Sequence, residues 1–148
     1  MVGHSGNYYN AAYVPLLPPL ARPASANSAS VDLQNYDSAA FLLNVGAAGD
    51  TWSGTNRVEA SLQESDDNST WTAVADADML SVVSGGQATG TFKVFNANAQ
   101  AGQLYVTGYR GNKRYVRVAL TNFGTTSTGT PMDVIAVLGR PRFAPVNS

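Results

Sequence analysis

Side chains able to do chemistry are few in this chain and stand far apart. The 148 residues include a single histidine, His4, and no cysteine. A serine or threonine nucleophile would need a base such as histidine beside it, and His4 lies in a terminal segment that we expect to be mobile. The lack of cysteine excludes a disulfide framework and thiolate metal ligands. The sequence therefore predicts a protein that is not an enzyme, with no catalytic residue, metal site or cofactor.

Acidic side chains gather in one region and are the remaining candidates for a metal site or for carboxylate catalysis. The group consists of Glu64, Asp66, Asp67, Asp76 and Asp78. Calcium ligands and the paired carboxylates of glycosidases are oxygens of this kind. No glycine-bearing calcium-loop pattern accompanies the group. We therefore interpret these side chains as turn-forming groups on a solvated edge.

A tryptophan in a polar loop, Trp52 between Asp50 and Gly54, has two interpretations. Sugar-binding surfaces carry such aromatic side chains, and Tyr105 and Tyr109 would be further stacking groups. This interpretation keeps a carbohydrate-binding or adhesion module as an alternative function. The indole's large apolar surface favours the other interpretation, in which Trp52 is buried and closes one end of the fold.

Four of the nine lysine and arginine residues lie in one short segment, namely Arg110, Lys113, Arg114 and Arg117. Basic residues among tyrosines are compatible with nucleic-acid contact, but so small a cluster on a chain of net charge -1 neutralises few phosphates. We therefore expect no nucleic-acid partner. Two interpretations remain: a solvated turn, or a charged interface at which these groups meet acidic ones, such as Asp66 and Asp67, across a subunit boundary.

The composition is poor in charge, since only 13% of the residues are charged. This balance excludes a general polyanion binder and a highly solvated disordered chain. The chain begins without a basic segment followed by an apolar one, and no run approaches the roughly 18 apolar residues of a membrane span. We expect a protein that is kept or assembled in a cytoplasm, with no membrane partner.

The elements that would position these side chains are strands. Residues 57–65 alternate, with Val58, Ala60 and Leu62 on one face, and they lead through a turn into residues 70–74, where Trp71 is a core candidate. A second hairpin is predicted between residues 104–107 and 115–120, with Gly111 in its turn because glycine takes positive φ readily. Val116, Val118 and Leu120 would face the core. Further strands are expected at residues 31–36, 38–45, 91–95 and 132–138. The apolar runs in residues 38–45 and 132–138 fit strands buried on both faces, with short buried helices as the alternative.

This spacing of short strands and small-residue loops predicts an all-β fold, a β-sandwich or jelly roll of about six to eight antiparallel strands. The length suits one domain. We expect the sandwich to span residues 30–140, with an extended arm at residues 1–29 and a tail at residues 141–148.

The arm combines large apolar side chains with prolines at positions 15, 18, 19 and 23. Proline forbids a regular helix or a central strand, and a disordered linker would be poorer in aromatic and aliphatic groups. We expect an extended segment that lies on its own domain or on a neighbour. The predicted contact residues are Tyr8, Tyr9, Tyr13, Leu16, Leu17 and Leu20.

Three segments together resemble a known class of protein: residues 62–74, LQESDDNSTWTAV, residues 111–118, GNKRYVRV, and residues 134–142, VIAVLGRPR. They resemble small virion proteins of tailed bacteriophages, in which an E-S-D-D-x-x-x-W-x-x-V hairpin precedes a K-R-Y-V-R-V strand and an apolar strand that ends in Gly-Arg/His-Pro. The resemblance covers residues 57–142 and leaves out the arm.

The resemblance implies a structural role in the virion, as a head decoration or cement protein on the outer surface of the capsid, assembled in the cytoplasm of a bacterial host. It also implies that the partners are the major capsid protein and sister copies, with the chain forming a homo-oligomer. A tail or head-completion component of the same fold is a further alternative.

Overall fold

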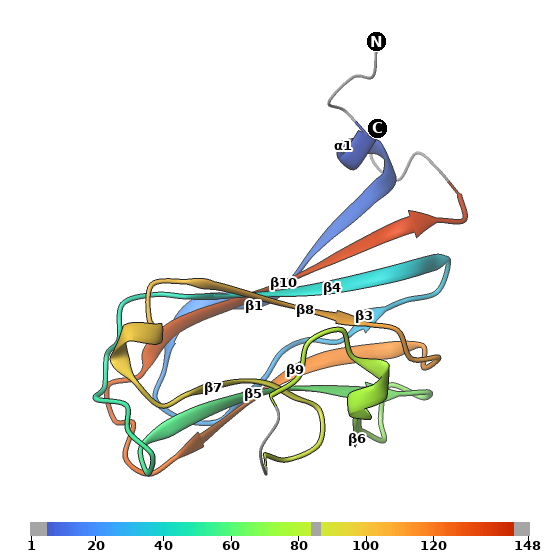
Figure 1. Ribbon diagram of the computed structural model, residues 1–148. Helices are drawn as coiled ribbons and strands as arrows, with labels where there is room; N and C mark the ends of the chain where they lie inside the picture. The colour runs from blue at the N-terminus through green and yellow to red at the C-terminus, as the bar shows by residue number, and fades with distance from the viewer. Residues whose placement is uncertain (1–5, 84–86, 144–148) are drawn as a thin grey trace.

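Two antiparallel sheets pack face to face and enclose an apolar core, so the chain is an all-β sandwich (Figure 1). The computed structural model describes residues 6–83 and 87–143. The core between the sheets is built mainly from aliphatic side chains, and the aromatic residues Phe41, Phe95 and Trp52 pack with them. The prediction of an all-β sandwich is confirmed. The described residues form ten strands rather than six to eight, because the arm contributes two strands, and three of the strands have only two residues each.

The first sheet has four strands in the order β1-β10-β4-β8. Their bounds are Ala11–Arg22 for β1, Thr130–Pro141 for β10, Tyr36–Val45 for β4 and Leu104–Tyr109 for β8. The strands β10 and β4 alternate between buried and more exposed residues, as expected for strands with one face on a core. In β4, for example, Phe41 and Leu43 are buried and Leu42 between them is only partly so.

The second sheet has six strands, centred on β9 and β5. It contains β2 (Ala26–Asn27), β3 (Val31–Asp32), β5 (Arg57–Ser65), β6 (Thr72–Ala73), β7 (Thr91–Phe95) and β9 (Tyr115–Phe123). The helical segments in the described residues are short: α1 (Gly6–Asn10), η1 (Asp76–Asp78) and η2 (Asn98–Gln100).

The alternation in residues 57–65 predicts both the strand and its faces correctly. Val58, Ala60 and Leu62 are buried on the core side of β5. The hairpin that follows is also confirmed, because β6 pairs with β5. The prediction that Trp71 lies in the core is wrong. Trp71 is half-buried on the outer side of the sheet, where the Arg117 guanidinium stacks 4.2 Å from its ring centre. Val74 takes the core position instead.

The second predicted hairpin is wrong. The two strands lie in different sheets, β8 beside β4 and β9 beside β5, so the five residues between them cross from one sheet to the other. The faces of β9 are nevertheless as expected, with Val116, Val118 and Leu120 in the core. Turn residues can signal a reversal of the chain, but the same residues serve a hairpin and a crossover between layers.

The predicted arm is extended, and most of it is an edge strand of the sandwich rather than a separate segment. Over Ala11–Arg22 it pairs with β10, with irregular register on either side of Leu17. An edge position tolerates prolines because one side of the strand forms no ladder. Residues 26–27 join the other sheet through β2, so no structural boundary falls at residue 29. At the other end β10 runs to Pro141, and residues 144–148 lie outside the described part of the chain.

Candidate functional site

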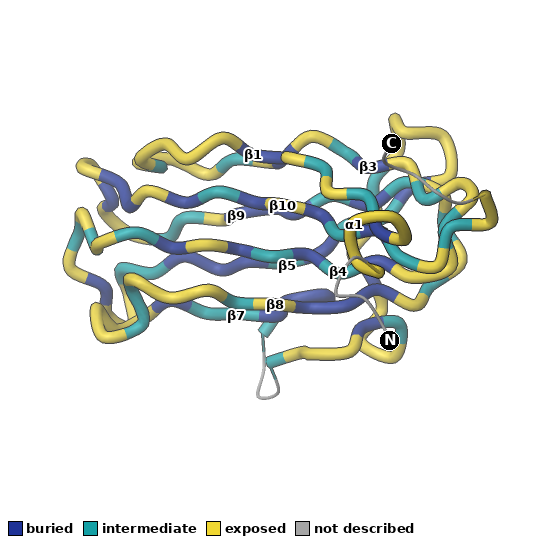
Figure 2. The backbone as a smooth tube through the Cα atoms, turned by 90° about the horizontal axis from the view of Figure 1, so that it is seen from above, coloured by how far each residue is buried: buried dark blue, intermediate teal, exposed yellow. Residues whose placement is uncertain are grey.

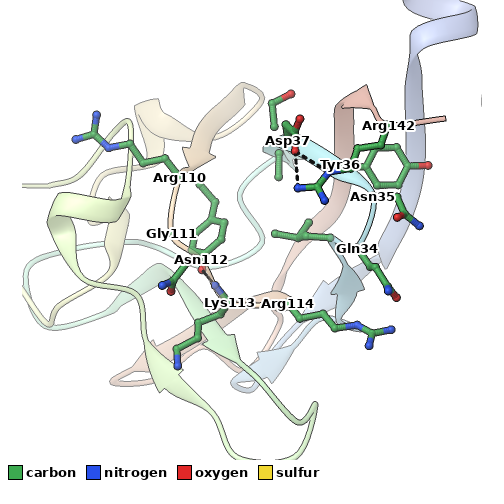
Figure 3. Close-up of a pocket in the computed structure, with 14 residues that line it drawn as sticks. Gln34, Asn35, Tyr36, Asp37, Arg110, Gly111, Asn112, Lys113, Arg114 and Arg142 are labelled. Carbon is green, nitrogen blue, oxygen red and sulfur yellow. Dashed lines mark hydrogen bonds and ion pairs between the residues drawn. The ribbon is translucent and has the colours of Figure 1, made fainter. Parts of the chain in front are cut away.

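A hollow of about 570 Å³ lies at one end of the sandwich (Figure 3). Three segments meet there: the turn that leads into β4, the crossover from β8 to β9, and the residues that follow β10. The crossover contributes Arg110, Lys113 and Arg114, three of the four clustered basic residues, so the structure brings part of the predicted charged group to this hollow.

Tyr109 fixes the shape of the crossover. Its buried hydroxyl donates a hydrogen bond to Glu64 Oε2 at 2.6 Å and accepts one from the Lys113 backbone N–H at 3.0 Å. Burial, reinforced by the bond to the Glu64 carboxylate, raises the pKa of Tyr109 well above its usual range. Gly111 is needed here because a Cβ atom would collide with the Tyr109 ring and hydroxyl, and not because of a positive φ.

The basic head groups do not converge on the hollow. Figure 3 shows the side chains of Arg110, Lys113 and Arg114 diverging from one another. Lys113 Nζ pairs with the Asp66 carboxylate, and Arg114 makes two hydrogen bonds to Asp32, of 2.9 and 2.7 Å. The bond from Arg114 lowers the pKa of Asp32. A pocket for an anion needs cations aimed at one point, and this arrangement disperses them.

The remaining two basic residues of the cluster also have partners within the chain. Arg110 donates to the carbonyl oxygen of Ala77 at 2.9 Å, and Arg117 donates to Gln63 Oε1 at 2.8 Å besides stacking on Trp71. The basic group and the acidic turn therefore meet inside one chain, at Lys113 and Asp66. That contact is exposed, and such pairs contribute little to stability.

Asp67 forms the turn after β5, as its residue type predicts. It accepts hydrogen bonds from the backbone N–H groups of Thr70 at 2.7 Å and Ser69 at 2.9 Å, and from the Ser65 hydroxyl at 2.9 Å. These bonds hold the pKa of Asp67 far below its usual range. Its carboxylate is thus occupied by the turn.

The aromatic side chains suggested as sugar-stacking groups lie inward. Trp52 has an exposed fraction of 5% and packs 5.3 Å from the ring centre of Phe95, as the interpretation that it closes one end of the fold predicts. Tyr109 is buried as well. Tyr105 is half-buried, with an edge contact to Phe95 and the Lys93 ammonium over its ring. These three residues form no common surface for a sugar, which needs an exposed aromatic face.

The predicted contact residues of the arm divide into two groups. Leu16 and Leu17 have exposed fractions of 4% and 7% and belong to the sandwich core, so they are not available to a partner in this fold. The other four are exposed, with fractions from 45% to 57%: Tyr8, Tyr9, Tyr13 and Leu20. The three tyrosines gather where α1 and the start of β1 project from the sandwich (Figure 1).

Sequence reasoning missed a further feature, the apolar outer face of the four-stranded sheet. Figure 2 looks down onto this face. The exposed residues here include Val106 and Ile135, and the hydrophobic run in residues 132–138 was the available signal. That run predicts burial on both faces of the strand, whereas one of the two faces is open in the structure.

No catalytic or metal-binding constellation stands out in the described ranges. Within residues 6–83 and 87–143 no three acidic or histidine side chains are grouped in a way that could hold a metal ion. His4 lies outside the described residues. No helix in this part of the chain is long and apolar enough to cross a membrane. Comparisons with protein-family models, with curated proteins and with solved structures found no match.

Proposed function

We propose that this chain is a structural protein of a tailed-bacteriophage virion, which decorates the outer surface of the head by binding the major capsid protein. The observation that carries the proposal is the projecting end of the chain, where Tyr8, Tyr9 and Tyr13 are all about half exposed. The order of the motifs in residues 57–142, which resembles that of small virion proteins, supports the same role.

Exposed tyrosines suit a protein contact. Each combines a large apolar ring with a hydroxyl and loses little conformational freedom on binding, and tyrosine is enriched among the residues that dominate interface energies. Tyr8 and Tyr9 already form an edge-to-face pair, with ring centres 5.1 Å apart. The projecting end therefore offers a preorganised aromatic anchor, which lowers the cost of binding.

A decoration protein stabilises a shell by linkage. Because it binds the assembled shell and not the free subunits, each bound copy shifts the equilibrium toward the assembled state. The sandwich supplies a rigid body, and the projecting end supplies the contact. In this proposal the hollow at the crossover neither binds a ligand nor carries out a reaction.

The test is binding to purified capsids of the phage that encodes the chain. Deleting residues 1–25 is unsuitable, since it removes β1 and with it Leu16 and Leu17 from the core. A Tyr8→Ser/Tyr9→Ser double variant leaves the sheets intact. We expect it to bind at least about 10-fold more weakly, since buried aromatic anchors typically contribute about 2 kcal/mol or more each.

The matched control is Tyr115→Ser, which changes a half-exposed tyrosine of the six-stranded sheet and should leave capsid binding unchanged. Equal binding by the double variant and the wild-type chain would show that the projecting end is not the contact.

A further inference from the structure

The outer face of the four-stranded sheet, called the outer face below, carries two uncharged rows across all four strands. The register places Pro15, Ile135, Leu42 and Val106 side by side in one row, which we call the ridge. The neighbouring row holds Tyr13, Val137, Ala40 and Gly108. Apolar rows of this extent are normally covered, because water in contact with them raises the free energy of the surface.

Both edges of this sheet are obstructed for part of their length. Prolines at positions 15, 18 and 19 interrupt the donors of β1. Along β8, Leu80 N–H donates to the Gly108 carbonyl at 3.0 Å, and the Thr107 hydroxyl donates to the Ser81 carbonyl at 3.0 Å. The face of the sheet is therefore more accessible to a partner than its edges.

The outer face has relief that is complementary to itself. Beside the ridge, the small residues Ala40 and Gly139 line a hollow of about 430 Å³. Tyr13, residues Asn7 and Asn10 of α1, and Leu80, whose side chain covers Gly108, line it as well. Opposite charges stand at the two ends of β10. Asp133 lies on one side of the ridge, and Arg140 lines the hollow on the other side. A second copy turned end for end would bring opposite charges toward each other and large side chains toward small ones.

We propose that two copies of this chain pair through their outer faces, with the strands of the two copies antiparallel and the twofold axis between the ridge and the neighbouring row. The ridge of each copy then faces the smaller side chains of the other. Figure 1 shows α1 and the start of β1 standing above this face, which limits the overlap of the two copies. Pairing is tested separately from the capsid contact, since it concerns the isolated chain in solution and the variants used differ.

The area of the outer face sets the expected affinity between the two copies. Four strands about 4.8 Å apart and seven residues of about 3.4 Å each give roughly 400 Å² per copy in plan. Two copies would bury roughly 800 Å² in plan, and side-chain relief raises this toward the roughly 1,000 Å² at the lower limit of specific interfaces. We therefore expect a weak dimer with a dissociation constant in the micromolar range.

The experiment is sedimentation equilibrium of the full chain over roughly a hundredfold range of concentration centred on about 10 µM. The average mass should rise from that of one chain to that of two. Val106→Lys should abolish the rise, because it places a charge on the ridge, whereas Ala73→Lys on the exposed strand β6 should not.

Charge reversal tests the antiparallel geometry and does not depend on the folding of the ridge variant. Asp133→Arg and Arg140→Asp should each weaken pairing by about 10-fold, and the double variant should restore it. A chain that stays monomeric, forms assemblies larger than two, or pairs equally well in Val106→Lys would overturn the proposal. Failure of the double variant to recover would overturn the geometry. None of these results bears on capsid binding.

Discussion

Replacing Tyr109 with phenylalanine should destabilise the sandwich although it removes a single oxygen atom. The hydroxyl connects three parts of the chain: β8, which carries it, the Glu64 carboxylate of β5, and the backbone N–H of Lys113 in the crossover. Because β8 and β5 belong to different sheets, the hydroxyl joins the two layers at the point where the chain passes between them.

The expected loss of stability in Tyr109→Phe follows from the two hydrogen bonds that its hydroxyl makes. A hydrogen bond to an ionised carboxylate contributes about 1.5–3 kcal/mol, and the Lys113 N–H loses an acceptor as well. Glu64 is only half-buried, so water can replace part of the interaction at the carboxylate. We expect a loss of about 2 kcal/mol in the free energy of unfolding, or roughly 4–8 °C in Tm for a chain of this size.

The assay is urea unfolding followed by tryptophan fluorescence, with Glu64→Ala and the double variant completing a thermodynamic cycle. Tyr115→Phe is the control, since the interaction of the Tyr115 side chain in the described residues is the Arg114 guanidinium over its ring, which phenylalanine keeps. A coupling energy of about 1 kcal/mol or more is expected between Tyr109 and Glu64. Additive effects, or a loss below about 0.5 kcal/mol in Tyr109→Phe, would refute the role assigned to this contact.

Two further predictions concern a loop and a turn. Gly49→Ala should cost about 1–3 kcal/mol, because the new Cβ atom would collide with the backbone carbonyl of Gly129, whereas Gly54→Ala meets open space and should be close to neutral in the same urea titration. Asp67 has a lowered pKa in the folded chain, so its contribution to stability is present at neutral pH and is lost as pH falls below about 4. Unfolding curves at several pH values should show that the wild-type chain is more stable than Asp67→Asn at neutral pH and that this difference in stability shrinks in acid. A difference in stability that does not change with pH would contradict this.

Local patterns predicted the strands better than they predicted the pairing of strands. The alternation of Val58, Ala60 and Leu62 reflects the two faces of one strand, so it can be interpreted without the rest of the chain. Whether residues 104–107 and 115–120 form a hairpin depends instead on which sheet each strand joins. That choice is set by contacts of β8 with β4 and of β9 with β5, which lie far away in the sequence.

The same limit applies to the surfaces. The tyrosines of the arm could be recognised by type, but Leu16 and Leu17 carry the same apolar signal and are used by the core. The outer face was predictable only in part: the apolar run in residues 132–138 is visible in the sequence, but the ridge takes one residue from each of four strands separated in the chain. The turn at Asp67 was predictable, since its hydrogen bonds join neighbours in the sequence.

Cryo-electron microscopy of virions of the phage that encodes this chain tests the proposed function most directly. We expect density for the sandwich at many positions on the outer surface of the head, with the end that carries Tyr8 and Tyr9 in contact with the major capsid protein. Density confined to the tail or to the head–tail junction, or contact with the capsid through another part of the sandwich, would contradict this account.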